Sequence, residues 1–258
     1  MTSNRGSFLS NMPPVTKNLL CINVLMWLAT MLLGSGGVGL GIVDIPRYLG
    51  LHFWQGSDFN PVQVVSYMFL HDSSTLQGGI THLFFNMFSL WMFGSMLERV
   101  LGAKRYLFYY LLCGVGAGLV QELWWQLSWR DMLAEVLSWQ GMQWINVDDW
   151  LPALRQNGQL NGFFNSMVTV GASGAVFGIL LAFGMLFPNL PMYIIPFPFP
   201  IKAKWMVLGY GLVELAFGVT GAVAGVAHFA HLGGMLFGFI TIMVWKRRGT
   251  IGGGNGIY

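Results

Sequence analysis

Long apolar runs separated by shorter polar segments dominate the pattern of the chain. A helix that crosses a bilayer needs about 20 predominantly apolar residues, because its backbone polar groups can be paired only within the helix. Six runs approach this length, and some are short enough to require tilt or shielding by their neighbours. They are Asn18–Leu33, Ile80–Met96, Tyr106–Leu123, Val168–Phe187, Trp205–Val219 and Val223–Trp245. The pattern predicts an all-α membrane protein with six transmembrane helices.

Lys and Arg residues are distributed unevenly over the polar segments. Cytoplasmic loops of membrane proteins carry an excess of these residues. If the N-terminus lies in the cytoplasm, ten of the 13 Lys and Arg residues fall on the cytoplasmic side. The three on the opposite side are Arg47, Arg130 and Arg155. We therefore expect both termini to be cytoplasmic.

Composition supports one membrane domain. The 258 residues are 55% hydrophobic and 9% charged, whereas a soluble domain carries about 25% charged residues. The net charge of +3 is too small and too scattered for a nucleic-acid surface. Cys21 and Cys113 lie in apolar runs and are interpreted as packing residues. We expect a cytoplasmic segment at residues 1–17, a six-helix domain at 18–246 and a Gly-rich cytoplasmic tail at 247–258.

Two long segments fall on the exterior side, at about residues 34–79 and 124–167. The second contains Trp124, Trp125, Trp129, Trp139, Trp144 and Trp150. Because indole rings prefer the headgroup zone, this loop could lie on the membrane as an amphipathic helix. The alternative is a folded cap over the helices.

Polar side chains within the apolar runs are costly in lipid and mark candidate functional positions. The second, fourth and sixth runs all begin on the exterior side in this orientation. Near their outer ends stand His82 and Asn86, then Ser173, then His228 and His231. Imidazole, amide and hydroxyl groups therefore share one layer in the outer half of the membrane.

Ser173 lies in the segment Gly171-Ala172-Ser173-Gly174, at the start of the fourth run. A helix N-terminus offers unpaired N–H groups and the positive end of the helix dipole, which suit a tetrahedral oxyanion. Gly174 and Gly178 also form a G-x-x-x-G pair, so close helix packing is an alternative interpretation. Both interpretations can hold together.

His231 precedes a second G-x-x-x-G pair, formed by Gly234 and Gly238. Two such faces allow helix backbones to approach closely. The approach would bring His231 to Ser173, which a neighbouring base can activate as a nucleophile.

His82 and Asn86 are four residues apart and share one face of the second predicted helix. Both side chains can donate hydrogen bonds. They could therefore serve an oxyanion, or they could bond to a neighbouring helix.

Taken together, these residues resemble the rhomboid family of intramembrane proteases. The matching elements, in order, are His82-x-x-x-Asn86, Gly171-x-Ser173-Gly174 and Ala230-His231-x-x-Gly234-x-x-x-Gly238. The similarity extends from about Asn18 to Trp245. It implies a six-helix bundle that cleaves single-span membrane proteins within or near the outer half of the bilayer. No metal or organic cofactor is expected.

The resemblance also implies a Ser–His dyad without an acidic third member. Ser173 would attack the scissile carbonyl, and His231 would accept its proton and later protonate the leaving amine. His82, Asn86 and the backbone N–H of Ser173 would hold the oxyanion. The residues expected to support the site are Gly171, Gly174, Phe177 and His228.

Some positions depart from the family pattern or add to it. Phe177 stands where members often have a Tyr stacked on the catalytic His. Val62-Gln63 stands near the place of a Trp-Arg pair in well-studied bacterial members, which leaves the role of that pair open. His228 is an additional histidine that could bind substrate, tune the dyad or pack. Glu98 looks like a family position, and we expect it to brace a loop.

Glu214 is an ionisable residue in the middle of the fifth run, where carboxylates are rare. Its position along the run places it away from the layer that contains Ser173 and His231. We therefore expect a structural role for Glu214, with regulation or gating as the alternative.

Two other functional classes compete with a protease. A rhomboid-like pseudoprotease, akin to derlins, would lack the serine or the histidine that this chain keeps. A transporter or channel would use acidic groups near mid-membrane and broken helices. Only Glu214 and the Pro-rich stretch Pro188–Pro200 point to it, and the stretch falls in a cytoplasmic loop.

The expected location is a bacterial plasma membrane, because the sequence shows no transit peptide. The pattern does not predict the natural substrate, the cut site or the oligomeric state.

Overall fold

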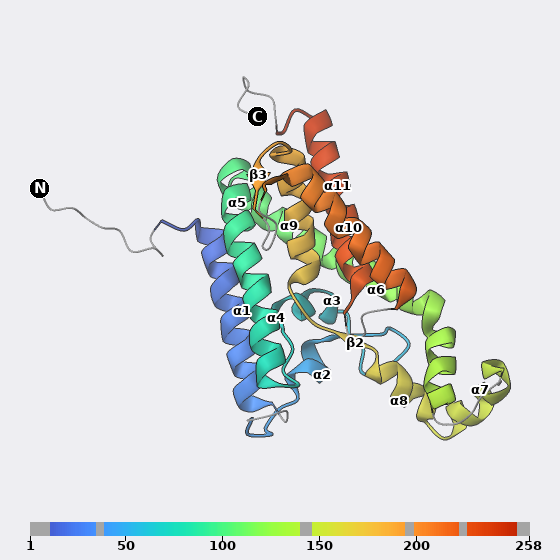
Figure 1. Cartoon of the computed structure of the whole chain (residues 1–258). Coiled ribbons are helices and arrows are strands. Elements are labelled where there is room, and N and C mark those ends of the chain that lie inside the picture. The colour runs from blue at the N-terminus through green and yellow to red at the C-terminus, as the bar shows by residue number, and fades with distance from the viewer. Residues whose placement is uncertain (1–10, 35–38, 140–145, 194–198, 222–225, 252–258) are drawn as a thin grey trace, which may run out of the picture.

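Figure 1 shows a helical molecule in which the long helices lie beside one another. The structure, a computed structural model, describes residues 11–34, 39–139, 146–193, 199–221 and 226–251. Several predicted features lie outside the described residues: residues 1–10 of the N-terminal segment, Trp144, residues 194–198 of the Pro-rich stretch, residues 223–225 of the sixth run and residues 252–258 of the tail.

The prediction of a mostly helical protein is confirmed, since a helix forms in each of the six apolar runs. The helices are α1 (Pro14–Leu33), α4 (Leu76–Ser89) continued by η3 (Leu90–Gly94) and α5 (Ser95–Leu101), α6 (Ala103–Trp139), α9 (Ser173–Leu186), α10 (Ala203–Thr220) and α11 (His228–Arg247). Within the described residues, four helical stretches are long and apolar enough to cross a membrane: α1, α4 through α5, α6 and α11. The chain is a multi-pass membrane protein.

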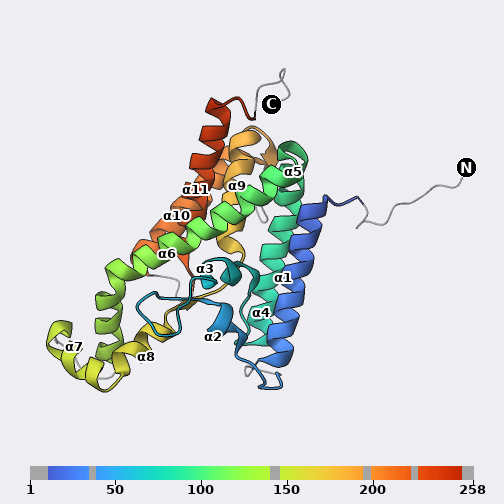
Figure 2. The same cartoon turned by 180° about the vertical axis from the view of Figure 1, so that it is seen from behind.

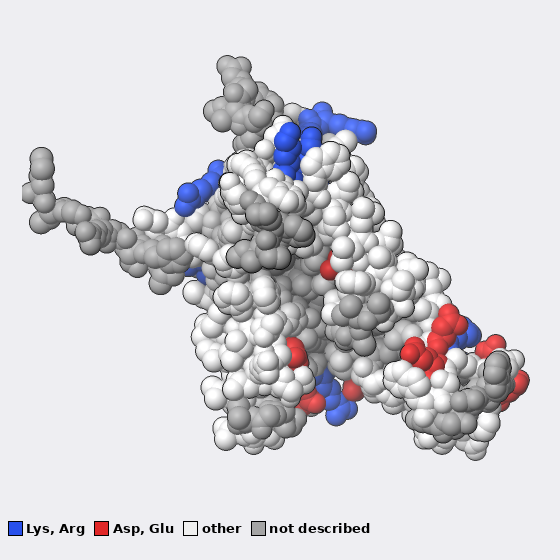
Figure 3. Space-filling view, in the orientation of Figure 1, with Lys and Arg blue, Asp and Glu red and all other residues white. Residues whose placement is uncertain are grey.

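Charged groups gather at the two ends of the molecule, and the surface between the ends is mostly uncharged in the view of Figure 3. Apolar side chains face outward there, among them Leu25 of α1 and Leu212 of α10. The start of α1 and the end of α11 lie at the same end of the bundle (Figures 1 and 2). Lys246 and Arg247 occupy the last turn of α11. This arrangement matches the charge asymmetry of the sequence.

Helix α11 packs along both α6 and α9, and glycines permit the closest approach. A Cβ atom built at Gly234 would overlap the carbonyl oxygen of Gly174. One at Gly178 would lie 3.0 Å from the carbonyl oxygen of Gly234, and one at Gly238 would lie 3.3 Å from the Cα of Gly178. The two glycine faces therefore meet, as the sequence predicted, and hold α9 against α11.

The predicted start of the fourth helix, at Val168, is wrong, because the first residues of that run are not helical. Val168–Thr169 form strand β2, which pairs antiparallel with β1 (Leu51–His52). Gly171 has a φ of 136°, which ends the extended segment, and α9 starts at Ser173. The β-branched residues before Gly171 favour this extended conformation. The first exterior loop is thereby joined to the segment that leads into Ser173.

Both predicted exterior loops contain further short helices. In Figure 2 those of the first loop lie between α4 and α6, and those of the second loop lie beside the lower end of α6. They are α2 (Ile45–Leu49), α3 (Gln63–Ser66) and the 3-10 helix η2 (Tyr67–Phe69) in the first loop, and α7 (Val147–Gln156) and α8 (Gln159–Ser166) in the second. On the opposite side, β3 (Pro191–Met192) pairs with β4 (Ile201–Lys202) between α9 and α10.

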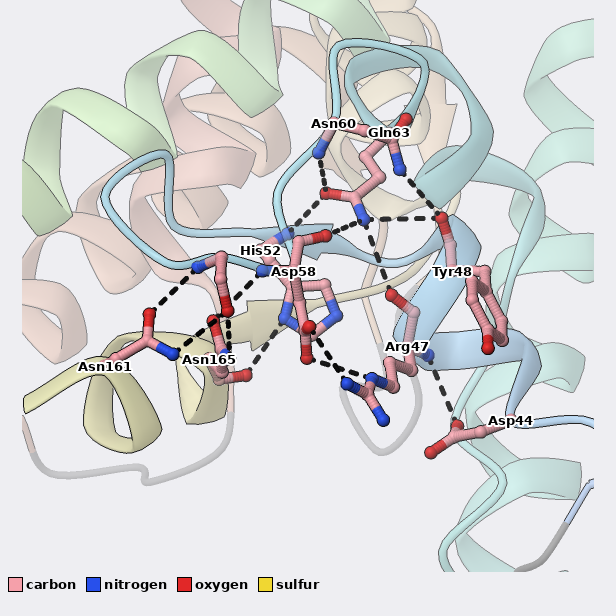
Figure 4. Close-up of polar contacts among 10 residues, drawn as sticks. Asp44, Arg47, Tyr48, His52, Asp58, Asn60, Gln63, Asn161 and Asn165 are labelled. Atoms are coloured by element: carbon pink, nitrogen blue, oxygen red, sulfur yellow. Dashed lines mark hydrogen bonds and ion pairs between the residues drawn. The ribbon is translucent and has the colours of Figure 1, made fainter. Parts of the chain in front are cut away.

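The second exterior loop is joined to the first by hydrogen bonds from α8 (Figure 4). The Asn161 amide donates to the Ser57 hydroxyl at 3.0 Å, and the Asn165 side-chain oxygen accepts from the Asp58 N–H at 3.1 Å. These bonds favour the folded-cap interpretation of this loop. The prediction that the third helix ends near Leu123 is wrong, because α6 continues to Trp139.

Gln63, at the position where the family pattern led us to look for an Arg, organises the first loop (Figure 4). Its side chain is fully buried. The amide donates to the carbonyl of Asp58 at 2.8 Å, and its oxygen accepts from the N–H groups of Asn60 and His52 at 3.2 and 3.3 Å. Its hydrogen bonds to the described residues all stay within the loop, and it acts there as a structural residue.

Glu98 holds the start of a helix rather than a loop, which corrects the expectation. Its buried carboxylate accepts the N–H of Val15 at 2.9 Å and that of Thr16 at 2.7 Å. The Thr16 hydroxyl donates to the same carboxylate at 2.8 Å. A carboxylate at these unpaired N–H groups caps the N-terminus of α1 and ties it to α5.

Candidate active site

Ser173 and His231 are hydrogen-bonded to each other, although 58 residues separate them in the sequence. The Ser173 Oγ lies 2.8 Å from Nε2 of the buried His231 ring. Ser173 is the first residue of α9, and His231 lies one turn into α11. The glycine contact between these helices holds the two side chains together. A serine hydroxyl bonded to an imidazole in this way can be activated as a nucleophile.

Phe177 packs against one face of the His231 ring and holds the ring in its orientation. The two rings are stacked with centroids 4.3 Å apart and planes 10° apart. Phe177 follows Ser173 by one helical turn, so α9 supplies both the hydroxyl and the stacking surface. The stacking predicted for this position is present without the hydroxyl of a tyrosine.

Gly171 leaves a space beside Ser173 that a side chain at this position would fill. Its φ of 136° is unfavourable for any residue with a Cβ atom. A Cβ atom built there would lie 3.0 Å from Nε2 of His82 and 3.4 Å from the Ser173 Oγ. Its N–H donates to the carbonyl of Tyr67 at 3.0 Å, which anchors the turn before α9.

His82 presents Nε2 to the same space, and its other nitrogen defines the tautomer. The backbone N–H of Asp72 donates to Nδ1 at 3.2 Å, so Nδ1 is an acceptor and Nε2 carries the proton in the neutral ring. The His71 ring packs edge-on against His82 with centroids 5.0 Å apart. His82 is therefore held with an N–H donor near Gly171 and Ser173.

Asn86 is buried, one turn after His82 on α4. Its amide nitrogen donates to the backbone carbonyl of His82 at 2.9 Å. In the described part of the chain its side chain makes no hydrogen bond to Ser173 or His231. An amide carries two N–H groups, so the nitrogen that bonds to His82 keeps a second donor.

The prediction that Glu214 lies away from the site is wrong. Its Oε2 atom lies 2.8 Å from Nδ1 of His231 and 2.6 Å from Nδ1 of His228. The prediction assumed that the position of a residue along its apolar run gives its depth in the membrane. In the structure α10 and α11 are tilted side by side, and a glutamate side chain is long enough to cover the remaining offset (Figure 1).

An acidic partner for His231 is therefore present, contrary to the dyad expected from the resemblance. A signal for it was available in the sequence. A carboxylate in an apolar run requires a hydrogen-bonding partner, and the two histidines at the start of the next helix were candidates for that partner. The same contacts give His228 a partner, since it shares the Glu214 oxygen with His231.

Three side chains of the site also have ligand atoms that could bind a metal ion. The atoms of Glu214, His228 and His231 lie within 4.8 Å of one another. Imidazole nitrogens and a carboxylate oxygen are common ligands of Zn²⁺. In the present geometry the same atoms are within direct hydrogen-bonding distance of each other.

The chain matches the family described as Rhomboid domain over residues 58–248. It is 26% identical over 217 residues to Rhomboid protein 1, mitochondrial, of Saccharomyces cerevisiae, which covers 81% of this chain and 50% of that protein. It is 29% identical over 187 residues to RHOMBOID-like protein 4 of Arabidopsis thaliana, covering 70% and 35%. It is 26% identical over 170 residues to Rhomboid protease AarA of Providencia stuartii, covering 64% and 51%.

The chain thus spans about half or less of the length of these relatives. The matched family region nevertheless includes all the side chains of the site, from His82 on α4 to His231 on α11. This chain belongs to the rhomboid family.

Proposed function

We propose that the chain is an intramembrane serine endopeptidase, with Ser173 as nucleophile and His231 as general base. The observation that carries the proposal is the 2.8 Å hydrogen bond between the Ser173 Oγ and Nε2 of His231. Membership of the rhomboid family supports it, as does the similarity to a bacterial protein named as a rhomboid protease.

In the proposed reaction, the Ser173 oxygen attacks the scissile carbonyl carbon while Nε2 of His231 takes the hydroxyl proton. The imidazolium then gives this proton to the leaving amine, and an acyl-enzyme remains. Water attacks the acyl-enzyme, with His231 again accepting a proton, and the serine is restored. Each transfer requires the bonded pair to stay within hydrogen-bonding distance, which the Phe177 stack supports.

The negative charge of the tetrahedral intermediate needs donors beside Ser173. The backbone N–H of Ser173 lies at the start of α9, where N–H groups have no partner within the helix. Nε2 of His82 carries a proton close to Gly171 and supplies a second donor. We assign the second N–H of the Asn86 amide, one turn after His82 on α4, as the third donor.

We further propose that six helices cross the membrane with both ends of the chain in the cytoplasm. The site then lies in the outer half of the bilayer, and the substrates are single-span membrane proteins. A bacterial plasma membrane remains the predicted location. The relatives include a bacterial protein and two proteins named as mitochondrial.

The experiment is a cleavage assay in liposomes with a panel of single-span reporter proteins. Cleavage by the native protein, and its loss in both Ser173→Ala and His231→Ala, is the expected result. Cleavage that survives Ser173→Ala would show that this serine is not the nucleophile. Ion flux that survives the same substitution would favour a transport function.

A further inference from the structure

One carboxylate oxygen, Oε2 of Glu214, lies between two imidazole rings. Both contacts involve Nδ1 atoms, at 2.6 Å to His228 and 2.8 Å to His231. The three side chains are largely buried, with 13% of the Glu214 side chain exposed and 7% and 9% of the two histidines. Glu214 lies on α10, so a third helix adds a side chain to the site that α9 and α11 form.

The direction of these hydrogen bonds determines the tautomer of His231. An ionised carboxylate can only accept, so each Nδ1 atom must carry the proton that it shares with Glu214. In the neutral His231 ring, Nε2 is then a bare acceptor, and it is the atom that faces the Ser173 hydroxyl. This is the protonation state that a general base requires.

The burial of Glu214 requires such partners. A carboxylate removed from water is strongly destabilised unless charged or polar groups compensate it. Here two N–H donors meet one oxygen. His228 thereby satisfies part of the carboxylate and limits its rotation, while His231 uses the same oxygen. When His231 takes the serine proton, the new imidazolium charge lies next to this anion.

We propose that Glu214 is a positioning residue that completes a Ser173–His231–Glu214 triad, with His228 as the residue that holds the carboxylate. The inference rests on the proposed function and extends it, because the resemblance implied a dyad without an acid. Glu214 acts through His231 and does not contact the substrate carbonyl.

The test compares kcat and KM of Glu214→Gln, Glu214→Asp and the native protein on one single-span reporter, over a range of pH. The matched control is Glu122→Gln, which also removes a buried carboxylate from a helix. Glu122 lies on α6, and its carboxylate accepts the N–H of Trp54 at 3.0 Å, outside the site. Rates are referred to the fraction of protein that is folded, measured by size exclusion in detergent.

We expect Glu214→Gln to lower kcat at least about tenfold with KM within about twofold, because only the charged transition state loses its partner. Glu214→Asp keeps the charge and should recover part of the rate.

A kcat of Glu214→Gln within twofold of both the native protein and Glu122→Gln would overturn the triad and leave the Ser173–His231 proposal intact. Failure of the native protein to cleave any reporter or to react with a fluorophosphonate probe would instead count against the proposed function itself. A metal chelator, added to the native protein in the same cleavage assay, provides a further test. We expect no effect on the native rate, and a loss restored by Zn²⁺ would assign the three groups to a metal ion instead.

Discussion

The two histidines nearest to Ser173 hold their protons on opposite nitrogens, and their partners determine this. Glu214 accepts from Nδ1 of His231, which leaves Nε2 as the acceptor that faces the serine. The N–H of Asp72 donates to Nδ1 of His82, which leaves Nε2 as a donor. One ring is therefore prepared to take a proton and the other to stabilise negative charge. Neither assignment follows from residue type alone.

Gly171→Ala should impair catalysis more than folding. The added Cβ would lie 3.0 Å from Nε2 of His82 and 3.4 Å from the Ser173 Oγ, so at least one of them must move. Displacements of about 1 Å in an active site can cost about 100-fold in rate. We expect kcat/KM on a single-span reporter to fall by about 10- to 100-fold.

Gly158→Ala is the matched control for backbone strain at Gly171. Gly158 also has a positive φ, 77°, but a Cβ atom there meets no atom of the described residues within 4 Å. It should lower the free energy of unfolding by about 1–3 kcal/mol without changing kcat/KM. Equal kcat/KM for Gly171→Ala and the native protein would show that the space beside Ser173 is not used.

His71 makes stability depend on pH. The side chain lies in the loop before α4 and is fully buried, and both ring nitrogens are without a hydrogen-bond partner among the described residues. Burial, with His82 nearby, lowers the pKa of the His71 imidazole from 6.5 to about 3. The folded protein therefore keeps this ring neutral at pH values where the unfolded chain binds a proton.

The direction in which stability changes with pH follows from this difference in proton binding. Above pH 6.5 both states are neutral and the stability is complete, and between pH 6.5 and about 3 it decreases as the pH falls. The loss approaches about 1.4 kcal/mol per pH unit. We expect the free energy of unfolding in detergent to decrease more steeply below pH 6.5 for the native protein than for His71→Phe. Parallel pH profiles of the two proteins would contradict the assignment.

Among the helices, the glycine faces of α9 and α11 determine whether the site can form. Gly174 and Gly234 are in backbone contact, and Ser173 and His231 lie directly beside this contact. Membrane helices lack a hydrophobic driving force for association and rely on such close packing. The same residues therefore serve packing and position the site, which the sequence had left as two compatible interpretations.

Gly234→Ala should separate α9 from α11. Its Cβ atom would overlap the carbonyl oxygen of Gly174, so the helices must move apart. Overpacking of this kind costs about 1–3 kcal/mol of unfolding free energy, and it should lengthen the Ser173–His231 hydrogen bond. The measurement is thermal stability together with reporter cleavage, and we expect both to fall.

The matched control is Gly209→Ala on α10, where a Cβ atom meets nothing within 4 Å in the part of the chain that the structure describes. It should leave stability and cleavage close to native values. A Gly234→Ala protein as stable and as active as Gly209→Ala would show that this helix contact is not important for the site.

Hydropathy predicted the helices better than it predicted their ends. It reports the solvent around a segment and not the backbone conformation, so it missed the part of α6 beyond Leu123. That part contains Gln126, Arg130 and Asp131, which lower the hydropathy but permit a helix. It also extended the fourth run over β2, because hydropathy alone does not distinguish a short apolar strand from part of a buried helix.

In the whole molecule, the site is assembled from segments that are distant in the chain. The first loop pairs with the strand before Ser173, α8 bonds to the same loop, and α10 brings Glu214 to α11. Sequence motifs identified Ser173 and His231, because the glycines that mark these two residues lie close to them in the sequence. The carboxylate of Glu214 in an apolar run signalled that it needs a partner, but its pairing with His231 was missed because that pairing depends on how α10 and α11 pack.

The most direct test of the account is the reaction of the detergent-solubilised protein with a fluorophosphonate probe, followed by mass spectrometry of the labelled peptide. We predict a single modified residue, Ser173, with labelling absent in Ser173→Ala and slowed at least about 100-fold in His231→Ala. Glu122→Gln should be labelled at the native rate. Labelling of a different residue, or unchanged labelling of Ser173 in His231→Ala, would contradict a serine nucleophile activated by this histidine.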